Sequence, residues 1–323
     1  MTDSIGRNRS RLSGLHVALF TPLRDDCPKR LYNSIDYEKA GAMIDTLLDI
    51  GVQGFVAVAT TGQSPTVTTE QHVEYVRFVH QRVRGRALVI AGAGSNCTRE
   101  AVELIRELRE IDTDMPCLCV TGYYNNPPQE GLHDHFTTLA DETGAQIILY
   151  NVPSRTGSNL EPETVIALSE HPGIIGIKQA VDFAHPGKHR EDTLRIARET
   201  AGRDFSILSG EDDSLVEVLE MGGVGIVSAT SNIPEAARRY LEILSAFRAG
   251  DLPKARALQD DILPFVRMVF SRKSPIPLAA LFNSPVFQPL TPLAATEGGE
   301  VLWNEMVQWA QHHAPSLQHW WKS

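Results

Sequence analysis

The sequence predicts an α/β protein in which eight parallel strands, each followed by a helix, close into a barrel. Short apolar runs rich in branched residues and bounded by turn signals are typical of buried parallel strands, and this chain contains eight. Neighbouring runs end at intervals from 26 residues (Tyr124 to Tyr150) to 34 residues (Thr60 to Gly94), about one strand–helix unit each. In chain order the runs are 16–20, 54–58, 87–91, 116–120, 147–149, 174–177, 205–208 and 224–228.

Helices are expected where apolar residues recur at helical spacing between these runs. The segments are 36–50, 70–83, 99–109, 130–142, 161–170, 192–199 and 213–221. Past Asn232-Ile233-Pro234 only helices follow, at 235–249, 252–270, 276–282 and 300–312. We therefore expect a (β/α)8 TIM barrel with an appended C-terminal helical layer. The expected division is a catalytic barrel at 14–234, a helical region at 235–313, and terminal arms at 1–13 and 314–323.

The composition narrows the function classes. The chain has 323 residues, 42% hydrophobic and 22% charged, which is typical of a globular protein. A formal net charge of −10 argues against a general nucleic-acid binder, which needs a basic face. No run of ~18 apolar residues exists to span a membrane, and the polar segment 1–13 has no secretory signal, so we expect a cytoplasmic protein. The scattered histidines and sparse cysteines form no metal constellation, so we predict no metal site.

Lys178 closes the sixth apolar run and is the sharpest single signal in the chain. Strand alternation places Ile174, Gly176 and Lys178 on one face, which in a barrel points inward. Burial disfavours the ammonium form and lowers the pKa of a lysine, which suits an amine that forms Schiff bases with carbonyl substrates. The alternative is a lysine that reaches the rim or pairs with an acid.

Further polar residues follow two other runs. Tyr150 ends the fifth run, one unit before Lys178, so we expect it beside the lysine at the same height, where it can transfer protons. Arg155 follows after a Pro-Ser turn and can hold a carboxylate through two hydrogen bonds. The ordinary alternatives are core packing for Tyr150 and a surface position for Arg155. The turn Thr60-Thr61-Gly62 offers hydroxyls and backbone N–H groups to an anionic oxygen.

Together these positions resemble the dihydrodipicolinate synthase branch of the pyruvate-dependent class I aldolases, the superfamily of N-acetylneuraminate lyase. The resemblance covers residues 15–278. Its most specific part is 150–157, because the sialic-acid lyase and sugar-acid aldolase branches usually lack Ser-Arg-Thr after Tyr-Asn-X-Pro. Further matches are Thr60-Thr61-Gly62, Tyr123-Tyr124-Asn125, Gln129-Glu130-Gly131, Gly176-Ile177-Lys178, Leu208-Ser209-Gly210 and Ser274-Pro275-Ile276-Pro277.

The resemblance implies a lyase of the hydro-lyase type. It would condense pyruvate with L-aspartate 4-semialdehyde, through a Schiff base on Lys178, to give 4-hydroxy-tetrahydrodipicolinate. That product is the first committed intermediate of lysine biosynthesis through diaminopimelate. The resemblance implies no cofactor beyond this covalent Schiff base, and a homotetramer built from two tight dimers.

The resemblance also assigns roles to individual residues. Thr60, Tyr150 and Tyr124 would form a proton relay, with Tyr124 contributed across a subunit interface. The implied substrate contacts are Thr61 for the pyruvate carboxylate, Arg155 for the semialdehyde carboxylate, and Gly210 and Val227 around the lysine.

Four positions depart from the family pattern. Ala59 and Gln63 replace a usual glycine and glutamate, Gly122 a usual proline, and Gln179 a usual glutamate. Neutral glutamines in place of acids change the local field and can shift the pKa of the lysine. The charged segment 182–190 after the Lys178 strand is longer than usual, and we favour an exposed loop over a reshaped entrance.

Two other functions remain open. One is a related Schiff-base aldolase or lyase for a 2-keto sugar acid, such as N-acetylneuraminate or 2-keto-3-deoxygluconate. The other is a catalytically silent barrel that acts as a binding or regulatory protein, although retention of the lysine, both tyrosines and both threonines argues against it. The terminal Trp320-Trp321 either packs on a partner or docks loosely.

A second site follows from the resemblance, because lysine-inhibited members bind lysine at the dimer interface. Asn96 and Glu100, four residues apart at the predicted helix start, are expected to share a face where Glu100 can hold an ammonium group. Thr69 stands where sensitive members usually have histidine or tryptophan, so we predict weak-to-moderate inhibition. The alternative is a set of ordinary polar interface residues. The matching positions are Ser64, His72, Asn96, Glu100 and Tyr123.

Overall fold

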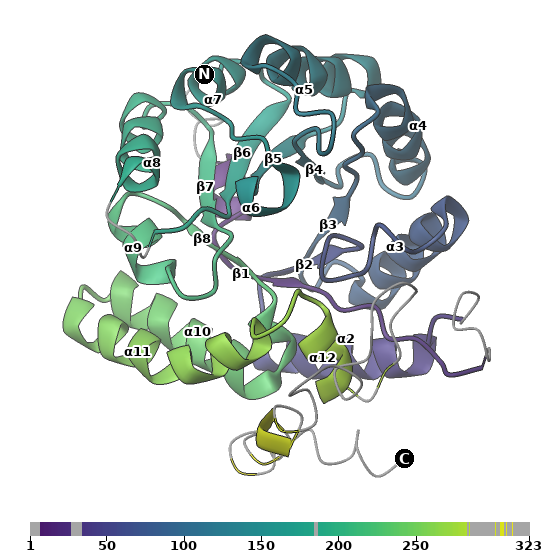
Figure 1. Cartoon of the computed structure of the whole chain (residues 1–323), viewed down its shortest axis with the longest axis vertical. Coiled ribbons are helices and arrows are strands. Elements are labelled where there is room, and N and C mark those ends of the chain that lie inside the picture. The colour runs from purple at the N-terminus through teal and green to yellow at the C-terminus, as the bar shows by residue number, and fades with distance from the viewer. Residues whose placement is uncertain are drawn as a thin grey trace. The chain divides into compact units, whose positions relative to one another are not determined.

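A computed structural model describes residues 7–26, 34–183, 187–282 and 284, and near the end of the chain 301, 304–306, 308 and 312. All eight expected strands are present and pair in chain order into a closed barrel, which confirms the predicted fold class (Figure 1). The strands are β1 (Gly14–Ala18), β2 (Gly54–Ala57), β3 (Leu88–Gly92), β4 (Cys117–Val120), β5 (Ile147–Asn151), β6 (Ile174–Gln179), β7 (Ser206–Ser209) and β8 (Gly225–Ser228).

The helices expected between residues 36 and 282 all form, and all but one lie within two residues of their predicted ends. The exception is α8, and three short helices, α1, α6 and the 3-10 helix η1, add to the prediction. The helices are α1 (Arg7–Arg11), α2 (Tyr37–Ile50), α3 (Thr69–Val83), α4 (Thr98–Arg109), α5 (Gln129–Thr143), α6 (Pro153–Thr156), α7 (Pro162–Leu168), α8 (Lys188–Glu199), α9 (Leu215–Glu220), η1 (Thr230–Asn232), α10 (Pro234–Arg248), α11 (Leu252–Val269) and α12 (Ile276–Leu281).

Two expectations fall on the C-terminal part of the chain. The helix expected at 300–312 lies only partly within the described residues, and Trp320-Trp321 lies outside them. Within the part of the chain that the structure describes, every helix is too short or too polar to cross a lipid bilayer.

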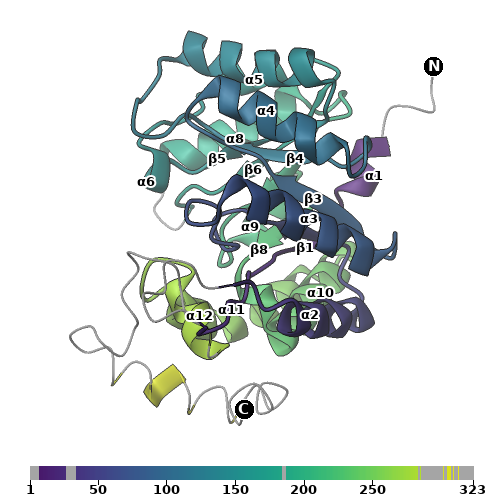
Figure 2. The same ribbon diagram turned by 90° about the vertical axis from the view of Figure 1, so that its right-hand side faces the viewer.

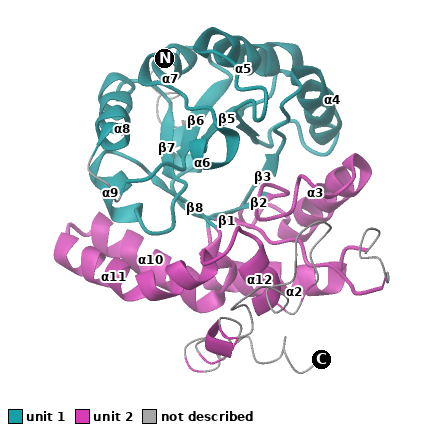
Figure 3. Cartoon of the chain, viewed as in Figure 1, with its two compact units in different colours: residues 1–16, 53–56, 88–228 teal, residues 17–52, 57–87, 229–323 magenta. Residues whose placement is uncertain are grey.

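The chain divides into two compact units (Figure 3). Unit 1 comprises 1–16, 53–56 and 88–228 and holds nearly all strand residues. Its helices α4 and α5 lie side by side outside the strands (Figure 2). Unit 2 comprises 17–52, 57–87 and 229–323 and holds α2, α3 and α10 to α12. The expected division into a barrel and a C-terminal helical region stays a prediction.

Local signals explain the helix ends in unit 2. The Asp36 side chain accepts a hydrogen bond from the Lys39 backbone N–H and caps the start of α2. Gly51 ends that helix at φ 94°, a left-handed conformation that glycine adopts without a side-chain clash. Thr68 and Gln71 form a reciprocal capping box at the start of α3. Near the other end of the chain, the ring of Phe282 stacks on Phe20 with centroids 5.5 Å apart.

Helix α1 was not predicted, because its sequence has no apolar period. Tertiary contacts hold it instead. The backbone N–H of Asn8 donates to the Asp204 carboxylate at 3.0 Å, and Arg11 donates to Gln146 Oε1 at 2.7 Å. The chain then buries Leu12 completely, near Gly176 of β6. These contacts fix the N-terminal segment of unit 1 against the strand that carries Lys178.

Candidate active site

Lys178 and Tyr150 lie side by side at the ends of β6 and β5. The two residues are register partners in the parallel pair, which confirms that they stand at the same height. Both are buried, with 6% and 7% of their surface exposed. The Lys178 Nζ atom lies 4.2 Å from the centroid of the Tyr150 ring. The amine therefore packs on the ring of the tyrosine whose phenol is the candidate proton carrier.

Two glycines allow close packing of the backbone around β6, the strand that carries Lys178. A Cβ at Gly176, two residues before Lys178 on the same face, would lie 2.6 Å from the Ser206 carbonyl oxygen. A Cβ at Gly210 would lie 2.9 Å from Ala180 Cα, and the Gly210 N–H donates to the Gln179 carbonyl at 2.6 Å. Only glycine permits such close backbone approach. Gly210 thus packs directly against the end of the strand that carries the lysine.

Val227 is buried in β8, on the inner side of the strands. Lys178 pairs in register with Leu208 of β7, and Leu208 pairs with Gly225 of β8. Registered neighbours point to the same face, and Val227 follows Gly225 by two residues, so it shares the face of Lys178.

Arg155 lies on the short helix α6, directly after β5. Its side chain is exposed, which leaves the guanidinium accessible to a dissolved anion. The segment that follows it is fixed by small polar side chains. The Ser158 N–H donates to Thr156 Oγ1 at 3.1 Å, and Ser158 Oγ donates to the Gly122 carbonyl at 3.0 Å. The Arg155 side chain is therefore exposed to solvent, while hydrogen bonds fix the backbone segment that follows it.

Tyr124 projects away from the chain, with 95% of its surface exposed. It adopts φ 71°, a left-handed conformation that costs a non-glycine residue on the order of 1 kcal/mol. Tyr123 beside it is 39% exposed. The structure of this single chain therefore does not bring Tyr124 to Lys178.

Glu211 was not singled out from the sequence. Burial and the neighbouring carboxylates of Asp212 and Asp213 raise the pKa of Glu211 to about 7, while Lys178 and Arg155 act in the opposite direction. Glu211 is therefore partly protonated near neutral pH and can exchange a proton there. The available sequence signal was a run of three acids directly after a buried strand.

Thr60 and Thr61 occupy the turn after β2, within unit 2. Thr61 is 5% exposed and Thr60 is half-buried. Gln63 braces the turn, because its Nε2–H donates to the Thr21 carbonyl at 3.1 Å, and Thr21 Oγ1 donates to the Gly62 carbonyl at 2.8 Å. An ionised glutamate could not donate to that carbonyl. The hydrogen bond to Thr21 therefore explains why position 63 suits a glutamine better than an ionised glutamate.

Among the residues matched to a lysine site, Asn96, Glu100 and Tyr123 lie in unit 1. The expectation that Asn96 and Glu100 share a helix face is wrong, because α4 begins only at Thr98. Asn96 Nδ2 instead donates to the Tyr123 carbonyl at 3.3 Å, and Glu100 accepts from Ser95 Oγ at 2.8 Å. The remaining two, half-buried Ser64 and buried His72, lie in unit 2.

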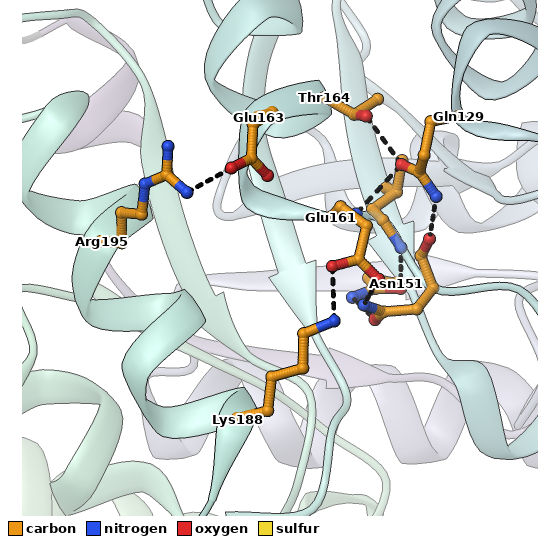
Figure 4. A network of polar contacts seen from close by, with 9 residues as sticks. Gln129, Asn151, Glu161, Glu163, Thr164, Lys188 and Arg195 are labelled. Atoms are coloured by element: carbon orange, nitrogen blue, oxygen red, sulfur yellow. Dashed lines mark hydrogen bonds and ion pairs between the residues drawn. The ribbon is translucent and has the colours of Figure 1, made fainter.

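The segment 182–190 is not one exposed loop, which corrects the prediction. Asp182 is exposed and Phe183 is buried, whereas 184–186 lie outside the described residues. Lys188 already begins α8, and its Nζ atom lies 2.7 Å from Glu161 Oε2 (Figure 4). This ion pair holds the first turn of the helix, whose sequence lacks the apolar spacing that would have predicted it.

Within the described ranges, no three His, Cys, Asp or Glu side chains are grouped so that they could hold a metal ion.

A family model described as "Dihydrodipicolinate synthetase family" matches residues 11–297. The chain is 40% identical to 4-hydroxy-tetrahydrodipicolinate synthase of Pseudomonas putida (strain W619) over 268 residues, which cover 83% of this chain and 86% of the relative.

Solved structures are similar over nearly the whole chain. One is the chloride-inhibited dihydrodipicolinate synthase from Acinetobacter baumannii complexed with pyruvate, at 29% identity and TM-score 0.83, covering 93% of this chain and 99% of that one. Another is DHDPS from Cyanidioschyzon merolae with lysine bound, at 31% identity and TM-score 0.81, covering 93% and 99%. With a family model that matches most of its length and relatives of this similarity, the chain belongs to the dihydrodipicolinate synthetase family of lyases.

Proposed function

We propose that this enzyme condenses pyruvate with L-aspartate 4-semialdehyde to 4-hydroxy-tetrahydrodipicolinate, through a Schiff base on Lys178. One observation carries the proposal: a buried lysine amine lies 4.2 Å from the centre of the Tyr150 ring, where β5 and β6 end. The name of the Pseudomonas putida relative and the pyruvate bound in the Acinetobacter baumannii structure support it.

The chemistry needs an amine, a proton carrier and an anion clamp. The neutral amine attacks C2 of pyruvate, and loss of one water gives the imine. Removal of a proton from the methyl carbon then gives an enamine, whose carbon attacks the aldehyde carbon of the second substrate. The amino group of that substrate attacks C2 and displaces the lysine, which closes the ring. One water and one proton are released for each pair of substrates, and no separate cofactor is needed.

The residue roles in this proposal follow the family resemblance. Thr60, Tyr150 and Tyr124 carry protons, and the exposure of Tyr124 in the single chain supports its contribution to a neighbouring subunit. The assembly proposed is a cytoplasmic homotetramer of two dimers. The substrate contacts proposed are Thr61 for the pyruvate carboxylate, Arg155 for the semialdehyde carboxylate, and Gly210 and Val227 around the lysine.

An assay of pyruvate with a panel of aldehydes tests the proposal, with Arg155→Ala as the key variant. Loss of the guanidinium is expected to raise the KM for aspartate semialdehyde about 10- to 100-fold, because a charged hydrogen-bonded pair contributes roughly 1.5–3 kcal/mol. The adduct that borohydride traps between pyruvate and Lys178 should form as in the unaltered enzyme.

Arg195→Ala is the matched control for this variant. Arg195 is also exposed, at 46%, but it pairs with Glu163 on α7 (Figure 4) and with Glu199 on α8. Loss of the Arg195 guanidinium should leave the KM values for pyruvate and for aspartate semialdehyde unchanged. An Arg155→Ala enzyme that uses the semialdehyde normally, or an unaltered enzyme that prefers a 2-keto sugar acid, contradicts the proposed substrate.

Lysine is proposed as an effector of this enzyme, through the five positions matched to the family's lysine site. Lysine is bound in the Cyanidioschyzon merolae structure, and here the Glu100 carboxylate is exposed and available to an ammonium group. Millimolar lysine is expected to reduce turnover weakly to moderately, and Glu100→Gln should reduce that inhibition. Undiminished turnover of the unaltered enzyme in millimolar lysine would remove lysine as an effector.

A further inference from the structure

A buried pair of amides lies directly behind the Lys178 and Tyr150 pair. Asn151 follows Tyr150 in β5 and Gln179 follows Lys178 in β6, and they are register partners. Because strand side chains alternate, both point to the side opposite the lysine. They are 1% and 2% exposed, and Asn151 Nδ2 donates to Gln179 Oε1 at 2.9 Å. One hydrogen bond thus joins the two strands one residue beyond the catalytic pair.

Further hydrogen bonds hold this pair in place. The second N–H of Asn151 Nδ2 points to Asn159 Oδ1 at 3.0 Å, and Asn151 Oδ1 accepts from the Leu160 N–H at 3.1 Å. On the other side, Gln179 Nε2 donates to Thr193 Oγ1 at 3.2 Å, and Thr193 is completely buried in α8. Buried amides that lose such partners are strongly penalised, so the arrangement has little freedom to shift.

The same network continues to the surface (Figure 4). Asn159 Nδ2 donates to Glu161 Oε1 at 3.1 Å, and the other carboxylate oxygen of Glu161 pairs with Lys188. Gln129 braces this turn, because its Oε1 accepts from the Glu161 N–H at 3.1 Å. The segment after β5 and the helix after β6 are therefore tied together, and both are tied to the amides behind the catalytic residues.

We propose that Asn151 and Gln179 are positioning residues, which hold the Tyr150 ring and the Lys178 amine in the geometry that proton transfer requires. Neither touches the substrate in this proposal, which rests on the proposed Schiff-base function. The hydrogen-bond requirement also explains why either glutamine or the family's usual glutamate serves at 179. A carboxylate there accepts from Asn151 and from the Thr193 hydroxyl, so both contacts persist with the direction of one reversed.

The test separates the two steps of the pyruvate half-reaction in the full-length enzyme. Borohydride trapping, read by mass, measures the Lys178 adduct, whereas exchange of the pyruvate methyl hydrogens in D2O, read by NMR, measures proton removal. Gln179→Leu breaks both hydrogen bonds at similar volume. It should slow methyl exchange about 10- to 100-fold, since a displacement of about 1 Å at a reacting group costs up to ~10²-fold, with much less change in the KM for pyruvate.

Two further variants distinguish positioning from general destabilisation. Gln179→Glu keeps both hydrogen-bond partners and should restore most of the exchange rate that Gln179→Leu loses. Thr200→Val removes another buried hydroxyl, directly after α8, which donates to the Ile196 carbonyl at 2.8 Å. It should lower the melting temperature without slowing exchange.

Three outcomes overturn the positioning role: normal exchange in Gln179→Leu, no recovery in Gln179→Glu, or equal slowing in Thr200→Val. If Gln179→Leu does not fold, the near-isosteric Thr193→Val, which removes one hydrogen bond to Gln179, replaces it. That variant should still slow exchange, and normal exchange overturns the role. Absence of any pyruvate adduct in the unaltered enzyme instead refutes the Schiff-base function itself, and the positioning role falls with it.

Discussion

Lys178→Met is expected to abolish turnover, with a loss of about 10⁴-fold or more, because removal of a covalent nucleophile leaves only binding and general electrostatic effects. Methionine has nearly the length of lysine and suits the buried position, where Lys178 is 6% exposed. Folding should therefore survive, and the melting temperature should not fall. The coupled assay measures turnover, and mass analysis after pyruvate and borohydride should find no adduct.

Lys39→Met provides the control for this variant. Lys39 is half-buried in α2, burial lowers its pKa, and its Nζ atom donates to the Phe282 carbonyl at 3.1 Å. Like Lys178, Lys39 is a lysine shielded from solvent, but it lies in unit 2 and its amine contacts a backbone carbonyl, so Lys39→Met should leave adduct formation and turnover unchanged. An adduct that persists in Lys178→Met, at any other lysine, would disprove the assignment of the nucleophile.

The strands were predictable because their signal is local. Each apolar run is bounded by turn residues, and a parallel strand buried on both faces needs no more information than that. The nearness of Lys178 and Tyr150 followed from the same regularity, since consecutive strands of a barrel end at one rim. What the sequence could place was therefore the backbone position of each polar residue.

The features that were missed depend on contacts between distant segments. Helix α1 depends on Asp204, and the first turn of α8 depends on Glu161, nearly thirty residues earlier in the chain. Glu211 was visible only as one of three acids, because its raised pKa depends first on burial in the folded chain and only then on the adjacent carboxylates of Asp212 and Asp213. Asn151 was not singled out, and Gln179 was noted only for the charge it lacks, because the hydrogen bond between them depends on the β5–β6 register.

Tyr150→Phe is expected to reduce turnover about 10²- to 10⁴-fold, the contribution typical of a positioned acid–base group. The ring remains, so the packing of Lys178 Nζ at 4.2 Å from its centroid is preserved and only the hydroxyl is lost. The trapped pyruvate adduct should still form, but exchange of the methyl hydrogens should become slow. This split between the two measurements separates loss of a proton carrier from loss of the nucleophile.

Tyr75→Phe makes the same chemical change at another buried tyrosine. Tyr75 is fully buried and donates to the Phe20 carbonyl at 3.2 Å, so its hydroxyl contributes on the order of 1 kcal/mol to stability and nothing to turnover. If Tyr150→Phe exchanges methyl hydrogens as fast as the unaltered enzyme, the phenol is not the proton carrier. Glu211 would then join Thr60 and Tyr124 as a candidate, because its pKa of about 7 lets it exchange protons near neutral pH and its carboxylate interacts with the charge of Lys178.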